Sequence, residues 1–137
     1  MRLREVSDIL WRERRLLELL QFKLTEEQLL VAAGRVRWLP SATREVELIM
    51  IELQRAELTR AVAVDELAID LGLVPNPSLA ELAAAAPDPW NGVFERHRHA
   101  LDVAVVEVNA LADESHRLLA CKVDDIRAAL QKVEATT

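Results

Sequence analysis

Apolar side chains recur at every seventh position along the N-terminal part of the chain. This register consists of Leu3, Leu10, Leu17, Leu24 and Val31. A second row, made of Ile9, Leu16 and Leu30, widens the same face. An apolar repeat sustained over four heptads is typical of a long amphipathic helix. We therefore predict a helix over about residues 3–33, ended by Gly34.

A second helical pattern covers about residues 41–71. Its apolar positions, at spacings of three, four and seven, are Val46, Ile49, Leu53, Ala56 and Ala63. Ser41 is a suitable N-cap, because its hydroxyl can accept a hydrogen bond from an unpaired backbone N–H. Two alternatives stay open at the other end: the helix continues through residues 65–71 to Gly72, or it breaks near Val64, since β-branched residues weaken a helix slightly.

Two proline-containing stretches bound a short connector helix. The run Ser78-Leu79-Ala80-Glu81 is a capping box, which predicts a helix over about residues 79–86. Prolines then interrupt the pattern again. We predict Asp88 as the N-cap of the last helix and Pro89 at its first position, where the missing N–H costs nothing. This last helix is predicted over about residues 89–133.

One apolar stripe follows the last helix and shifts by one residue after Leu119. Its first part holds Phe94, Leu101, Ala104, Val108, Leu111 and Leu118, and its second part Val123, Ile126, Leu130 and Val133. At about 1.5 Å per residue this helix is roughly 20 Å longer than the first one. Residues 120–137 are therefore expected to extend past their neighbours, and a stripe that the monomer cannot bury indicates a partner. The alternative, that this segment folds back or frays, stays open.

The composition favours an all-α fold. The 137 residues include 3 Gly, 5 Pro and no Tyr, whereas strands favour aromatic and β-branched residues and sheets need many turns. This length suits one domain. We predict a single domain, residues 1–137, built as an elongated antiparallel three-helix bundle or coiled coil with a short connector helix and a long C-terminal helix.

Charge and cysteine content limit the partners and the compartment. The net charge of −6 argues against a nucleic-acid partner, which normally requires a basic surface. No apolar run reaches the roughly 18 residues of a membrane span, and the N-terminus lacks the apolar core of a signal peptide. A single cysteine suits a reducing compartment. We expect a cytoplasmic protein with no membrane span.

No catalytic or metal site is evident in the sequence. A di-metal site in a helical bundle needs two matching Glu-x-x-His pairs, which three histidines do not supply here. We expect His97 and His99 to face solvent beside their neighbouring arginines. Glu13 and Glu27 fall on core-register positions, and we expect them at the edge of the helix seam, paired with Arg or Lys of another helix. Cys121 is interpreted as a small buried side chain. The sequence predicts a protein that is not an enzyme and has no catalytic residue, cofactor or metal.

Six short segments follow one another in a characteristic order. They are LWRERRLLELL (10–20), LVAAGR (30–35), TREVE (43–47), LGL (71–73), SLAEL (78–82) and LADESHRLL (111–119). In their order and spacing, over about residues 3–133, the chain resembles the FlgN-type flagellar export chaperones, which escort the hook–filament junction proteins.

The resemblance implies a non-enzymatic chaperone with an elongated three-helix body. Such proteins bind the C-terminal regions of hook-associated proteins, their clients, prevent premature assembly and deliver them to the type III export apparatus. The resemblance also implies that the C-terminal amphipathic region binds the client. The candidate client-binding residues are Leu111, Leu118, Leu119, Val123, Ile126, Leu130 and Val133.

A competing hypothesis uses the same stripe differently. In it the chain is a homo-oligomeric helical scaffold or regulatory protein, and the C-terminal stripe pairs with its own copy as a homodimer.

Overall fold

The computed structural model describes residues 2–136, without the side chains of Ile126 and of residues 134–136. This part of the chain is mainly helical and contains no strand. The all-α prediction is therefore confirmed. The elements in chain order are α1 (Leu3–Ala32), the 3₁₀ turn η1 (Val36–Trp38), α2 (Leu39–Leu71), α3 (Leu79–Ala85) and α4 (Trp90–Thr136).

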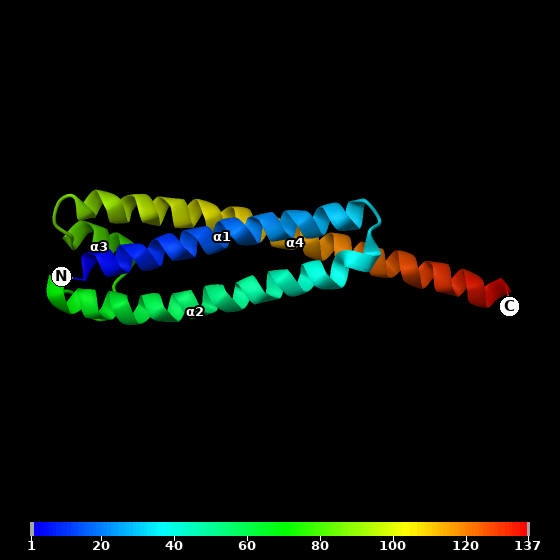
Figure 1. Ribbon diagram of the computed structural model, residues 1–137, viewed down its shortest axis with the longest axis horizontal. Helices are drawn as coiled ribbons and strands as arrows, with labels where there is room; N and C mark the ends of the chain where they lie inside the picture. The colour runs from blue at the N-terminus through cyan, green and yellow to red at the C-terminus, as the bar shows by residue number, and fades with distance from the viewer. Residues whose placement is uncertain (1, 137) are drawn as a thin grey trace.

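The three long helices form an elongated bundle with α1 in the middle (Figure 1). Helix α2 returns antiparallel to α1, and α4 runs again in the direction of α1. Helix α1 packs along both neighbours, whereas α3 packs against the first part of α4. The last turns of α4 project past the bend between α1 and α2, so one end of the bundle is uneven.

The core is divided into two clusters along the bundle. The larger one lies at the α3 end and comprises Leu3, Val6, Leu10, Leu17, Ala63, Val64, Leu67, Leu82, Ala83, Ala86, Phe94 and Leu101. The smaller one lies toward the bend and comprises Leu20, Leu24, Val46 and Ile49. The heptad register of α1 is thus buried as expected from Leu3 to Leu24, because both neighbouring helices pack on that one face.

The beginning of α2 differs from the prediction. The helix starts at Leu39, so Ser41 lies inside its first turns and is exposed rather than acting as the N-cap. The 3₁₀ turn leads directly into α2, and Pro40 occupies the first turn, where its missing N–H is no loss. At the other end the helix continues without a break to Leu71. Gly72 ends it in the left-handed conformation, with φ 69°.

The connector helix begins as predicted, and α4 begins one residue late. The Ser78 hydroxyl accepts from the Glu81 N–H and the Glu81 carboxylate accepts from the Ser78 N–H, which completes the capping box. Helix α4 begins at Trp90. Its first amides bond to the Pro87 carbonyl oxygen, so the backbone sets the first turn and the predicted N-cap, Asp88, lies outside it.

Candidate functional site

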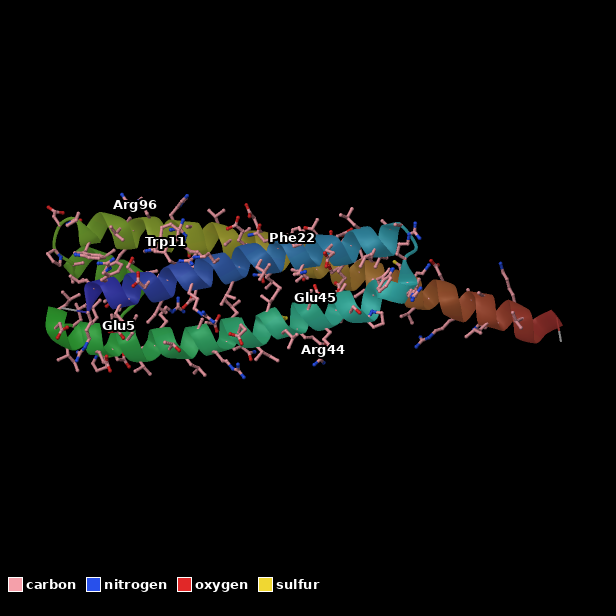
Figure 2. All side chains as sticks on the ribbon, in the orientation of Figure 1. Glu5, Trp11, Phe22, Arg44, Glu45 and Arg96 are labelled. Atoms are coloured by element: carbon pink, nitrogen blue, oxygen red, sulfur yellow. The ribbon has the colours of Figure 1, made fainter. Side chains whose placement is uncertain are left out.

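The end of α4 that extends past the body carries several exposed apolar side chains. Ser115 is the last buried side chain, and every described side chain from Val123 to Val133 is exposed. Val123 is 47% exposed, and Leu130 and Val133 are each 58% exposed. Figure 2 shows the side chains of this segment projecting with no other helix beside them. The segment stays helical to Thr136 and does not fold back onto the body.

The predicted client-binding residues divide into two groups. Leu111 packs against the smaller core cluster, and Leu118 and Leu119 are half-buried. The second group, Val123, Ile126, Leu130 and Val133, lies on the exposed segment, although the side chain of Ile126 is outside the described ones. The structure therefore brings only part of the predicted set onto the exposed stripe. We call this second group the tail stripe.

A polar contact between α1 and α4 holds the helix just before the exposed segment. The Gln28 side-chain amide donates to the Leu111 carbonyl oxygen at 2.9 Å and to the Ser115 hydroxyl at 3.1 Å. The Ser115 hydroxyl also lies 3.5 Å from the carbonyl oxygen of Leu24. The role of Gln28 was missed in the sequence, because a single glutamine in a helix rich in polar residues carries no distinguishing signal.

The prediction that His97 faces solvent is wrong. The side chain is 1% exposed, with Nε2 3.0 Å from the Ser7 hydroxyl and Nδ1 3.2 Å from the Arg14 guanidinium. Because arginine only donates, Nδ1 accepts and the neutral ring donates from Nε2 to Ser7. Trp11, labelled in Figure 2, meets the imidazole edge-on at 5.1 Å between ring centroids.

Burial of the His97 ring, together with the positive charges of Arg14 and Arg96, lowers its pKa to about 4. One sequence signal could have found this position. His97 lies three residues after Phe94 and four before Leu101, on the same buried stripe. His99, in contrast, is exposed as predicted.

Both core-register glutamates are buried, each 3% exposed, rather than at the edge of the seam. Glu13 pairs with the Arg60 guanidinium at 3.2 Å, as expected of a residue opposite another helix. Glu27 instead accepts from the Thr43 hydroxyl at 3.0 Å. Burial raises the pKa of Glu13; Arg60 opposes this shift and Glu57 adds to it.

A shallow apolar cavity of about 380 Å³ lies over α1, between α2 and α4. Most of its lining is aliphatic, and its charged groups are Glu13, Glu57 and Arg60.

In the part of the chain that the structure describes, no group of three or more His, Cys, Asp or Glu side chains could hold a metal ion. Cys121 is exposed, which contradicts its prediction as a buried side chain. No helix among the described residues is long and apolar enough to cross a membrane.

The comparisons with known proteins give one match. The model of the family described as FlgN protein matches residues 1–136. A search of the curated proteins and a search of the solved structures each return no match. The family match spans nearly the whole chain, including the body and the exposed end of α4. The chain belongs to the FlgN family of flagellar chaperones.

Proposed function

We propose that the chain is a cytoplasmic type III export chaperone for flagellar hook-associated proteins. It binds their C-terminal regions, prevents their premature assembly and delivers them to the export apparatus. The observation that carries the proposal is the tail stripe, an apolar face on a helix that extends past the body that would otherwise cover it.

The binding mode follows from this arrangement. An amphipathic client helix that packs along the tail stripe removes the exposed Val123 and Leu130 side chains from water. The half-buried Leu118 and Leu119 continue the same surface toward the body. The contacts of Gln28 with α4 hold the base of this surface in place. A client segment that becomes ordered on binding gives up part of the interaction energy.

The test compares two double variants in the full-length chain. Val123→Asp with Leu130→Asp places charges on the tail stripe. Ala128→Asp with Gln131→Asp places the same charges on other faces of the same exposed turns. Burying a valine or leucine side chain contributes about 1.5–3 kcal/mol, so the first pair should weaken binding of a hook–filament junction protein at least about a hundredfold.

Isothermal titration with the C-terminal region of the client measures this difference. The control pair should bind like the unmodified chain, and circular dichroism should show the same helical content for all three proteins. Equal client affinity for both pairs would contradict the proposal.

The scaffold hypothesis predicts a different outcome for the same variants. If the tail stripe pairs with its own copy, the unmodified chain dimerises and the Val123→Asp, Leu130→Asp chain is monomeric in light scattering across a concentration series. Client binding would then be unaffected by the stripe variants.

A further inference from the structure

The outer face of α2, away from α1, carries a second apolar stripe that the proposed function does not use. Its apolar members are Leu48, Ile51, Leu58, Val62 and Ile69, between 45% and 76% exposed. In Figure 2 no ribbon covers this side of α2, along the lower edge of the view. Single apolar residues scattered over a surface are ordinary, but five exposed large aliphatic side chains along one helix face indicate an interaction site.

The positions of this stripe alternate by three and four residues, as the a and d positions of a coiled coil do. The complete series is Leu48, Ile51, Arg55, Leu58, Val62, Asp65 and Ile69. We call these seven residues the outer stripe. Its two polar members carry opposite charges, and both are exposed.

The polar members make contacts at the surface that leave them able to form others. Arg55 donates to Glu52 at 3.0 Å, one helical turn away, and such exposed pairs contribute little. One oxygen of Asp65 accepts the Asn76 N–H at 2.7 Å. A carboxylate has two oxygens and accepts several hydrogen bonds, so Asp65 can also meet a cation.

Six of the seven members of the outer stripe pair with one another when a second copy of α2 lies antiparallel to it, and Leu48 lies opposite the partner's Gly72, just past the end of α2. In the register that sets position 60 of one helix level with position 60 of the other, Ile51 faces the partner's Ile69, and Leu58 faces the partner's Val62. In the same register Arg55 faces the partner's Asp65, twice by symmetry. Each of these pairs joins an a position to a d position, which is the pairing that antiparallel helices make.

Other arrangements put the charges in unfavourable places. Parallel packing sets Arg55 against the partner's Arg55 and Asp65 against the partner's Asp65, and like charges repel. Sliding the antiparallel pair by one heptad sets Arg55 against the partner's Leu58 or the partner's Gly72, which leaves a charge without its partner in the seam. The two charged residues therefore select one orientation and one register.

We propose that the outer stripe is a homodimer interface in which α2 packs antiparallel against α2 of a second copy. The contact is isologous, with the same patch on both chains. The stripe from Leu48 to Ile69 is about 32 Å long at 1.5 Å per residue. One helix pair buries less than the roughly 1,600 Å² of a standard interface, so the dimer dissociates on dilution.

This dimer keeps the tail stripe available. Because the two α2 helices run in opposite directions, the exposed ends of the two α4 helices lie at opposite ends of the assembly. Each copy can then bind its own partner protein. The inference rests on the outer stripe and is independent of which client the tail stripe binds.

The test is a charge exchange followed by sedimentation analysis over a concentration series. Arg55→Asp sets Asp against the partner's Asp65, and Asp65→Arg sets Arg against the partner's Arg55. Each variant alone should dimerise at least about tenfold more weakly than the unmodified chain, since two like-charge contacts replace two attractive ones. An equimolar mixture of the two variants should recover the dimer, because both contacts again join Arg to Asp.

The chain with both substitutions should also dimerise with itself. Circular dichroism checks that the variants keep their helical content, and the Val123→Asp, Leu130→Asp chain should dimerise like the unmodified one. A chain that remains monomeric up to about 1 mM overturns the proposal. So does a dimer that neither single substitution weakens, or a mixture of the two variants that stays monomeric.

Discussion

The two halves of α4 have the same kind of amphipathic sequence and opposite surroundings. In the first half, Phe94 and Leu101 are buried against α1 and α3, and even a histidine on the stripe is 1% exposed. In the second half, Val123 and Leu130 lie in solvent. The helical pattern continues through both halves, and what changes is the presence of neighbours. Helix α1 has 30 residues and α4 has 47, so α4 extends past α1.

An apolar stripe in the sequence therefore shows which face of a helix can be buried, and not whether that face is buried in the folded chain. Where α1 and α3 are present, the stripe stabilises the fold. Where they end, the same pattern leaves apolar side chains exposed, and we propose that these bind the client. The two regions should therefore respond in opposite ways to substitution: the first in stability, the second in binding.

The largest expected effect is on stability in the covered half. Phe94→Ala removes a fully buried ring and should lower the free energy of unfolding by about 3–5 kcal/mol. Leu130→Ala, on the exposed half of the same helix, should change it by no more than about 0.5 kcal/mol. Urea unfolding of both variants measures the difference. Comparable losses would mean that the exposed half is also packed in solution.

The next largest effect is the pH dependence of stability, to which the buried His97 in the first half of α4 contributes. The His97 pKa is about 4 in the folded chain and about 6.5 in the unfolded one, so between these values the unfolded chain binds more protons. Stability should therefore fall as the pH falls from about 6.5 to about 4, by up to about 3 kcal/mol from this residue. His97→Gln should remove that part of the decline in urea unfolding followed at several pH values.

His116 is the matched control, because it is an exposed histidine in the later part of α4. The His116→Gln chain should keep the acid-side decline of the unmodified chain. If the His97→Gln chain loses as much stability toward acid as the unmodified chain, the buried neutral histidine is not its source.

The smallest effect tests the element that covers the first half of α4. Ser78→Ala removes the hydroxyl that caps α3 and should cost about 1 kcal/mol. Ser41→Ala is the control, because Ser41 lies inside α2 and is exposed. Its thermal midpoint should match that of the unmodified chain, whereas that of the Ser78→Ala chain should be lower. Equal midpoints would show that the capping box does not stabilise α3.

The contrast between these two serines explains which helix ends are predictable. Ser78 follows a Pro-containing stretch that cannot be helical, and Glu81 completes a reciprocal pair of hydrogen bonds, so the signal is local and complete. Ser41 follows Pro40, which looks like a break but is tolerated in a first turn. Whether the chain before it joins the helix depends on the bend between α1 and α2, and no local pattern specifies that bend.

The candidate site was predictable in outline and not in detail. The length difference between the helices and the late stripe on α4 predict an exposed apolar end. From the helix lengths, residues 120–137 were expected to extend past their neighbours, and the described end of α4 does so. The lengths did not show that Leu111 and Leu118, assigned to the same client-binding set as Val123, are partly buried. Their burial depends on how far α1 extends beside them. His97 was predicted to face solvent because arginines flank it, whereas its spacing from Phe94 and Leu101 places it on the buried stripe.

The sequence by itself determined the helices, their lengths and the faces they can bury, because these depend on spacing, caps and breakers within a few residues. The tertiary structure decided which stretch of each face is covered. It placed α1 between α2 and α4, buried Glu13 against Arg60 and His97 against Ser7, and left Val123, Leu130 and the outer stripe exposed. The physical reason is that burial is a property of two surfaces, and the second surface comes from a distant part of the chain or from another molecule.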